Sequence, residues 1–336
     1  MKKTCTFNLT NSILHASILL MFFSIISCDS DNNDTIAEEE NDTVENVYTG
    51  NAMFTNQGEV NAFMAQQYDR ITGSISFIGS SISSVNNMLS ITSINGNIII
   101  LGTSLANLDG LSNISIEDDG HFIQVINNPL LENVDGLSNI DAELLLLEIR
   151  ANPLLEQING VDGVTNVTFI IEVSDNDSLL NIDGLINIDN PVTSLYLRNN
   201  PQITNTNGIT GITEVTQSFL FTDNDSVITI TEMPNLNLVG NLFLDRNDSL
   251  TNIDGLSELV TCNNVTIQSN PSLINVDGFS KLENVDEGSM RITNNNSLRD
   301  FCGLSLISTI SSFGYNITNN LYNPTKEDIA SGNCSI

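Results

Sequence analysis

Short stretches in which apolar and polar residues alternate recur along most of this chain, from Ile71 to its end. The stretch Leu195-Tyr196-Leu197-Arg198 is typical, and such alternation predicts a β-strand whose alternate side chains point inward. A glycine follows each stretch at intervals of 23 to 26 residues, with Glu232 in the place of one: Gly110, Gly136, Gly160, Gly184, Gly208, Gly255, Gly278 and Gly303. A period of this regularity predicts stacked repeats, and therefore an all-β parallel solenoid.

Other positions of the repeat also have predictable roles. An Asn lies three residues after the second inward residue of each strand: Asn128, Asn152, Asn176, Asn200, Asn224, Asn247, Asn270 and Asn295. An Asn at the same place in every repeat can bond backbone groups of its own and of the neighbouring repeat. The next residue is Pro, Asp or Asn, which favours a turn. The Asp-Gly that comes later predicts a corner at which Gly adopts a positive φ.

Residues 55–70 are predicted to form a helix before the repeats begin. Asn56 followed by Glu59 has the spacing of an N-cap with its capping-box partner. An apolar stripe then follows at helical spacing: Val60, Phe63, Met64 and Tyr68. Because a stacked array needs its first core layer covered, we expect this helix to cap the solenoid of residues 71–336.

The first 27 residues predict a secretory signal peptide, because two lysines, an apolar run from Ile13 to Ile26 and a small Ser27 precede Cys28. The tetrapeptide ending at Cys28 is similar to the lipobox of bacterial lipoproteins, in which this Cys carries lipid after cleavage. We therefore expect Cys28 to be lipidated and to attach the protein to a membrane. The alternative is an uncleaved anchor, whose apolar core is too short to span a bilayer comfortably.

Residues 28–54 are predicted to be an acidic, disordered tether, because Asp29 to Glu45 carries eight acids and no Lys or Arg. Such a run after the lipid-bearing Cys favours display on the cell surface, and an Asp directly after that Cys favours inner-membrane retention. We expect an outer-membrane location at the cell surface. The net charge of −31 becomes −33 without the two leader lysines. This argues against nucleic acid and anionic membrane surfaces as partners.

The repeats resemble the receptor L domain, a leucine-rich-repeat-like, right-handed solenoid of growth-factor receptors, fungal cell-wall proteins and bacterial surface lipoproteins. The resemblance covers about residues 71–336 and depends on units such as Asn270 to Phe279, an Asn-Pro-x-Leu-x-x-Ile-x-Gly-Leu pattern. Glu232 in place of Gly and Thr206 in place of an apolar residue depart from it in single repeats. The resemblance implies a binding or adhesion role and brings no catalytic residue.

The end of the chain, from about residue 301, resembles the C-terminal cap of that family. The similar segments are Phe301-Cys302-Gly303-Leu304 and Tyr322-Asn323-Pro324-Thr325. Cys302 stands where other repeats have Asp, at a corner that Cys334 could reach. In an oxidising compartment we expect a Cys302–Cys334 disulfide that leaves Cys262 unpaired. The alternative is two separate buried thiols.

Outward strand positions stack about 4.8 Å apart from repeat to repeat, so each position forms a column on the surface. One column is Gln124, Glu148, Glu172, Tyr196, Leu220, Phe243, Thr266 and Arg291, and its neighbour is Ile126, Arg150, Ser174, Arg198, Thr222, Asp245, Gln268 and Thr293. We predict that an exposed apolar strip with its charged neighbours binds a ligand: Tyr196, Leu220, Phe243, Arg198, Arg150 and Glu172. The alternative is that the strip reflects only the preference of strands for aromatic residues.

Catalysis is not expected from this sequence. Glu148 and Glu172 in one column allow a calcium site or the acid of a polysaccharide-cleaving enzyme, but two solvated carboxylates beside Arg150 are the preferred interpretation. Asp175-Asn176-Asp177 lacks EF-hand spacing, and His121 is the only His outside the leader. We predict a non-enzymatic lipoprotein without metal or cofactor that binds an extracellular protein or glycan. A purely structural envelope component is the remaining alternative.

Overall fold

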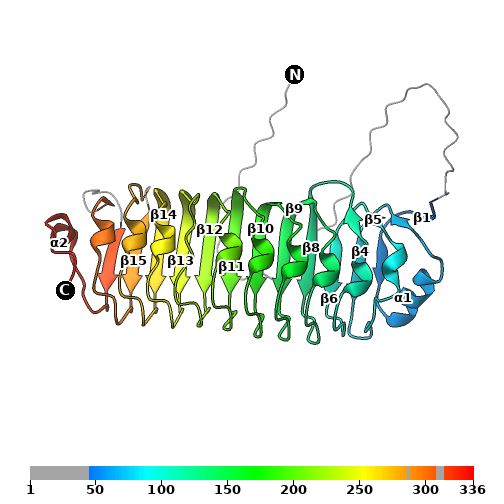
Figure 1. The fold of residues 1–336 in the computed structure, drawn as a ribbon. Helices are drawn as coiled ribbons and strands as arrows, with labels where there is room; N and C mark the ends of the chain where they lie inside the picture. Colours follow the sequence, from blue (N-terminus) through cyan, green and yellow to red (C-terminus); the bar gives the residue numbers. More distant parts are fainter. Residues whose placement is uncertain (1–44, 286–287, 308–313) are drawn as a thin grey trace, which may run out of the picture. The chain divides into compact units, whose positions relative to one another are not determined.

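The computed structural model describes residues 45–285, 288–307 and 314–336 (Figure 1). The predicted signal peptide, the predicted lipidation at Cys28 and most of the predicted tether lie outside these residues. The described part is mostly β, and its repeats follow one another so that each adds one strand to a long parallel sheet. The predicted parallel β class is therefore confirmed.

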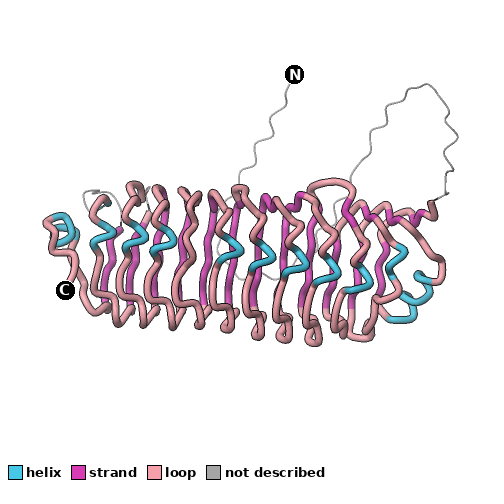
Figure 2. The backbone as a smooth tube through the Cα atoms, viewed as in Figure 1, coloured by secondary structure: helices cyan, strands magenta, loops and turns pink. Residues whose placement is uncertain are grey.

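The main sheet has 12 strands, which lie in the order of the chain (Figure 2). They are β2 Ala52–Phe54, β4 Ile75–Ile78, β6 Ile98–Leu101, β8 His121–Ile126, β9 Glu143–Arg150, β10 Asn166–Ser174, β11 Val192–Arg198, β12 Glu214–Thr222, β13 Leu238–Asp245, β14 Thr261–Gln268, β15 Ser289–Thr293 and β16 Gly314–Thr318. A second parallel sheet contains β1 Val47–Tyr48, β3 Arg70–Ile71, β5 Ser93–Ile94 and β7 Ser115–Ile116. Each long strand is followed by a return segment that brings the chain back to start the next strand.

Short 3-10 helices lie in these return segments, and all but the first have Gly as their central residue. They are η1 Met88–Ser90, η2 Asp109–Leu111, η3 Asp135–Leu137, η4 Asn159–Val161, η5 Asp183–Leu185, η6 Asn207–Ile209, η7 Asp254–Leu256, η8 Asp277–Phe279 and η9 Cys302–Leu304. Two α-helices, α1 Gln57–Met64 and α2 Lys326–Ala330, lie near the two ends of the described chain. The repeats therefore stack strand on strand and 3-10 helix on 3-10 helix.

The core lies between the main sheet and the return segments. The strand residues predicted to point inward are all fully buried: Leu147, Ile149, Ile171, Val173, Leu195, Leu197, Phe219, Phe221, Leu242, Leu244, Val265, Ile267, Met290 and Ile292. The return segments complete the core with Leu155, Leu179, Ile203, Val227, Leu250, Leu273 and Leu298. The alternation of the sequence thus predicts the inward residues correctly.

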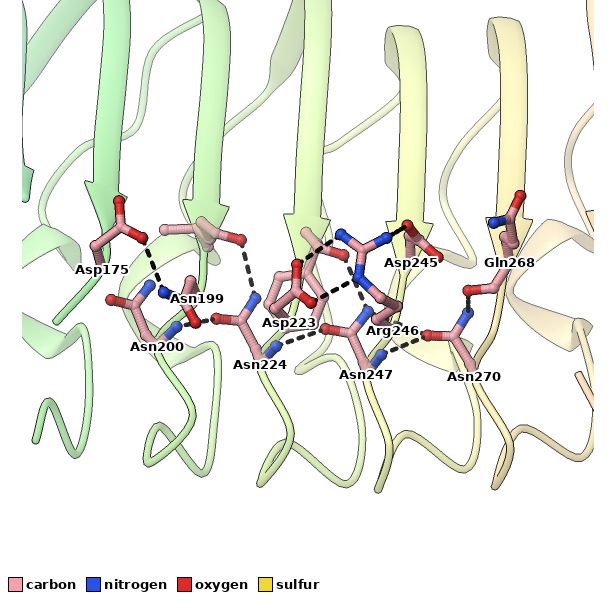
Figure 3. A network of polar contacts seen from close by, with 12 residues as sticks. Asp175, Asn199, Asn200, Asp223, Asn224, Asp245, Arg246, Asn247, Gln268 and Asn270 are labelled. Carbon is pink, nitrogen blue, oxygen red and sulfur yellow. Dashed lines mark hydrogen bonds and ion pairs between the residues drawn. The ribbon is translucent and has the colours of Figure 1, made fainter. Parts of the chain in front are cut away.

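The Asn of each repeat forms a ladder that runs through the corner below the strands (Figure 3). Asn152 is representative: its backbone N–H donates to Asn176 Oδ1 at 3.1 Å, and its Nδ2 donates to the backbone oxygen of Val125 at 2.9 Å. The ladder ends at Asn320, whose N–H donates to Asn323 Oδ1 at 2.9 Å. The predicted bonds to neighbouring repeats are confirmed, and each amide satisfies backbone groups that the corner would otherwise bury unpaired.

The residue before each ladder Asn has a left-handed backbone conformation, with φ between 50° and 62°: Asn127, Ala151, Asp175, Asn199, Asp223, Arg246, Ser269, Asn294 and Asn319. Most residues at this position are Asn or Asp, which tolerate such φ values better than other side chains. This is the corner at which the chain reverses direction after each strand. The repeat pattern predicted a positive φ at its glycines instead, and this prediction is wrong, because none of the repeated glycines has a positive φ.

The repeated glycines are required for close approach between repeats. A Cβ atom on Gly184 would lie 2.0 Å from the backbone oxygen of Ile158, and one on Gly136 would lie 1.8 Å from that of Leu108. Such distances are far shorter than any van der Waals contact, so only Gly lets the 3-10 helix of one repeat lie against the repeat before it.

The repeat that carries Glu232 keeps the core without forming a 3-10 helix of its own. Met233 is fully buried, and its N–H donates to the backbone oxygen of Gly255 at 2.9 Å. The preceding departure, Thr206, is also buried, and its hydroxyl accepts a 2.8 Å bond from the N–H of Thr231. The two departures from the repeat pattern thus lie next to each other. The Thr206 hydroxyl satisfies a backbone N–H in the repeat that lacks a 3-10 helix.

The N-terminal helix begins as predicted but is shorter than the predicted range 55–70. Asn56 Oδ1 accepts the N–H of Glu59 at 3.1 Å, and the Glu59 carboxylate accepts the N–H of Thr55, not that of Asn56, at 2.6 Å. The helix ends at Met64, and Gln67 has a φ of 53°, so the chain has turned before β3. The predicted tether 28–54 is also too long, because β1 and β2 lie within its last residues.

The C-terminal segment is held against the last repeats by the Cys302–Cys334 disulfide, which confirms the predicted pair. The N–H of Phe301 donates to the backbone oxygen of Cys334 at 2.9 Å, and α2 begins with a capping box between Thr325 and Asp328. Cys262 is buried and unpaired, as expected.

Candidate binding face

The two outward columns of the main sheet have the predicted register. In the first column, Glu172 pairs with Glu148 on one side and with Tyr196 on the other, and the column continues to Leu220 and Phe243. In the second, Ser174 pairs with Arg150 and Arg198, and the column continues to Thr222 and Asp245. The structure therefore brings all six predicted binding residues to one face, on strands β9 to β13.

The apolar strip on this face is less exposed than the sequence analysis predicts. Tyr196, Leu220 and Phe243 are all half-buried. The guanidinium of Arg198 lies over the ring of Tyr196, with its central carbon 5.5 Å from the ring centroid. One face of that ring is therefore already in a cation–π contact within the chain.

The charged residues of the face pair with one another. Arg198 forms an ion pair with Glu172, and Arg150 forms one with Glu148. Ser174 Oγ also donates to Glu172 at 2.9 Å, and Gln124 donates to Glu148 at 2.6 Å. Glu148 is 9% exposed, so this carboxylate is buried as well as paired. The two acids are thus not the solvated carboxylates that the sequence analysis considered.

Three polar atoms of the second column are buried and have no partner within the described part of the chain. Arg198 Nε and Asp245 Oδ1 lie on either side of Thr222, and the third atom is Thr293 Oγ1 on β15. Burial raises the pKa of Asp245, and the charge of Arg246 opposes this shift only in part. These buried polar atoms are therefore left unsatisfied within the described chain.

A further ion cluster lies at the C-terminal ends of β12 and β13 and was not predicted (Figure 3). Arg246 donates to both carboxylate oxygens of Asp223, at 2.7 and 2.8 Å, and also contacts Asp245. The bond to Asp223 raises the pKa of Arg246. The signal in the sequence was an Arg at the position before a ladder Asn, where most other repeats have Asn or Asp.

The most exposed apolar side chains beside this face were also missed. Phe169 is 53% exposed and Leu145 is 48% exposed, at the beginning of β10 and β9. Between the pairs Val167–Leu144 and Ile170–Leu146, β10 has two residues where β9 has one, so a bulge displaces Phe169 from the regular alternation. Pattern reasoning from period two cannot place a residue that lies in a bulge.

Metal and acid–base chemistry find little support in the described residues. They contain no group of three or more His, Cys, Asp and Glu side chains that could hold a metal ion. Burial lowers the pKa of His121, whose Nε2 lies 3.1 Å from Asn95 Oδ1. Two small pockets lie at the ends of the stack, one of about 220 Å³ beside α1 and one of about 300 Å³ beside β16. The predicted binding face lies outside both pockets.

A scan against protein-family models matches no family, and a search of curated proteins finds no relative of this chain. Within residues 45–285, 288–307 and 314–336, no helix has the length and apolar character needed to cross a membrane. The receptor L-domain resemblance therefore stays a prediction.

Proposed function

We propose that this protein is a lipid-anchored component of the outer cell surface that binds an extracellular protein or glycan. In this proposal the stacked repeats form a right-handed parallel solenoid of the receptor L-domain type. Helix α1 and the disulfide-linked C-terminal segment cap its two ends, and the lipid on Cys28 attaches it to the membrane. The outward face of β9 to β13 is the binding surface.

One observation carries this proposal. Tyr196, Leu220 and Phe243 lie in register on three neighbouring strands, next to Arg198 and Asp245, which each keep an unpartnered polar atom. A flat apolar strip bordered by polar groups is the arrangement that protein interfaces use. The ion pairs of Glu148 and Glu172 favour binding over acid catalysis, since each carboxylate already has an arginine partner.

A screen of the full chain against arrays of glycans and of surface proteins tests the proposal. We expect at least one specific ligand, and we expect the double variant Tyr196→Ser, Phe243→Ser to lose most of that binding while its melting temperature changes little. Retained binding by the double variant would remove this strip from the site.

The same protein should be assayed for polysaccharide cleavage in the presence of calcium. We expect no turnover. Turnover that is lost in Glu172→Gln would establish the enzymatic alternative in place of the binding function. A chain that binds nothing and cleaves nothing would support the structural alternative.

A further inference from the structure

The apolar residues at the beginning of β8 to β10 form a patch separate from the predicted strip. It consists of Phe122, Leu145, Leu146, Phe169 and Ile170, and we refer to it as the Phe169 patch. Leu146 pairs with both Phe122 and Ile170 across neighbouring strands, and Leu145 lies opposite the bulge that carries Phe169. Five apolar side chains on three consecutive strands thus adjoin one another.

Phe169 and Leu145 are the two exposed side chains of the patch, and the other three are half-buried. Phe169 and Leu145 are about half exposed, whereas Tyr196 and Phe243 of the predicted strip are more covered. A large aromatic ring held on a rigid strand loses little conformational entropy on binding, which makes it a good anchor. Bulges often redirect a side chain in this way at functional surfaces.

The border of the Phe169 patch is acidic and has no counter-charge in the described chain. Asp119, Asp141 and Glu143 are exposed, and no ion pair within the described residues involves them. Asp119 and Glu143 are also close together, since Asp119 Oδ1 accepts the N–H of Glu143 at 3.2 Å. The nearby basic residues Arg150 and Arg198 are already paired with Glu148 and Glu172.

The chemistry of the patch favours a protein over a glycan. The side chains of the patch itself carry no hydrogen-bonding atom, and three of them, Leu145, Leu146 and Ile170, are branched aliphatic groups that suit an apolar protein surface better than the hydroxyls of a sugar. Unpaired carboxylates next to an apolar anchor are complementary to Lys and Arg side chains. The net charge of −31 also attracts a basic partner at long range and repels a second copy of this chain.

We propose that the Phe169 patch anchors a protein partner that presents an apolar surface bordered by Lys and Arg. This inference rests on the proposed binding function and names the class of the partner. Phe169 and Leu145 make the apolar contact, and Asp119, Asp141 and Glu143 pair with the basic border.

The test measures the binding of two fluorescent peptides to the full chain by anisotropy. One peptide alternates lysine with leucine, and the other alternates lysine with serine. We expect the wild-type protein to prefer the leucine peptide, and we expect Phe169→Ser to lower its affinity for that peptide about tenfold. Ile228→Ser is the matched control, because Ile228 is 58% exposed in a return segment and its replacement leaves the net charge unchanged. This control should bind like the wild-type protein.

The comparison separates this inference from the proposed function. Equal losses in Phe169→Ser and Ile228→Ser, or no preference for the leucine peptide, would overturn the inference. A loss in the Tyr196→Ser, Phe243→Ser variant alone would also overturn it but keep the proposed binding face. A loss in Phe169→Ser alone would support the inference and move the site away from the predicted strip. Circular dichroism of each variant confirms that the fold is intact.

Discussion

At the scale of single residues, many polar side chains of this protein serve a repeat other than their own. Asn176 shows this best, because its Oδ1 accepts the N–H of Asn152 at 3.1 Å and its Nδ2 donates to the backbone oxygen of Ile149 at 3.0 Å. All of these groups are buried, so water cannot replace a lost partner. A ladder amide therefore stabilises two repeats at once.

We predict that Asn176→Ala lowers the free energy of unfolding by about 3 kcal/mol, because it leaves several buried backbone groups unpaired. Chemical denaturation with circular dichroism measures this change. Asn263→Ala is the control, since Asn263 is exposed and outside the ladder, and it should change the free energy by no more than about 0.5 kcal/mol. Similar values for the two variants would contradict a structural role of the ladder.

Cys262 gives a second prediction at this scale. Burial raises the pKa of its thiol to about 12, from an ordinary value of 9.0. The native protein should therefore not react with iodoacetamide at pH 8, and the denatured protein should react. Above pH 9 the unfolded thiol loses its proton while the folded thiol keeps it, so the stability should fall as the pH rises toward 12. Cys262→Ala should reduce this fall, and an equal pH dependence in both proteins would contradict the assignment.

At the scale of secondary-structure elements, the packing of one 3-10 helix on the next determines whether a residue larger than glycine can be accommodated there. Gly184 in η5 has no room for a Cβ, whereas a Cβ on Gly314 in β16 would meet its nearest neighbour at an ordinary 3.4 Å. A methyl group therefore fits at Gly314, whereas at Gly184 it would collide with the backbone of the preceding repeat.

We predict that Gly184→Ala destabilises the protein by about 3 kcal/mol, because neighbouring repeats must separate to admit the methyl group. Gly314→Ala should change the stability by less than about 1 kcal/mol. Thermal unfolding of both variants tests this difference. A stable Gly184→Ala protein would show that the repeats can shift apart at little cost.

The N-terminal helix shows why element boundaries were harder to predict than element types. Tyr68 continues the helical spacing of Val60 and Met64 and packs against the same core, but it reaches that core from beyond the helix, after the turn at Gln67. A residue can therefore satisfy an apolar pattern without belonging to the element that the pattern suggests. The spacing of apolar residues reports contact with the core and not the path of the chain.

At the scale of the whole described unit, stability depends on closing the two ends of the repeat stack. At the N-terminal end, Phe63 of α1 packs against Phe54 and Tyr48 with ring centroids 5.0 and 5.1 Å apart. At the C-terminal end, the disulfide joins Cys302 to Cys334 across 32 residues. Each closure covers core residues that no further repeat would cover.

We predict that the double variant Cys302→Ser, Cys334→Ser loses about 3 to 4 kcal/mol of stability, as expected for a loop of this length. Reduction of the wild-type protein with dithiothreitol should produce a similar loss. The same reagent should leave the double variant unchanged, because Cys262 forms no disulfide. A wild-type protein that is insensitive to reduction would contradict a stabilising role for the bond.

The sequence by itself determined the repeat, the inward and outward columns and the ladder Asn. These follow from a period of two within each strand and from a nearly constant spacing between strands, so the spacing alone places Glu172, Tyr196 and Leu220 side by side. These features depend on residues that are close in the chain or on positions that repeat along it. They remain recognisable when a single repeat departs from the pattern, as it does at Glu232.

Only the tertiary structure decided how exposed the side chains of these columns are and which of them contact one another. The ion pairs of Glu148 and Glu172, the cover of Arg198 over Tyr196 and the exposure of Phe169 depend on side-chain conformations and on one bulge. The close approach that requires Gly184 also joins groups in different repeats. The spacing of the repeat places residues two dozen positions apart side by side, but it does not determine whether their side chains are exposed, paired or covered.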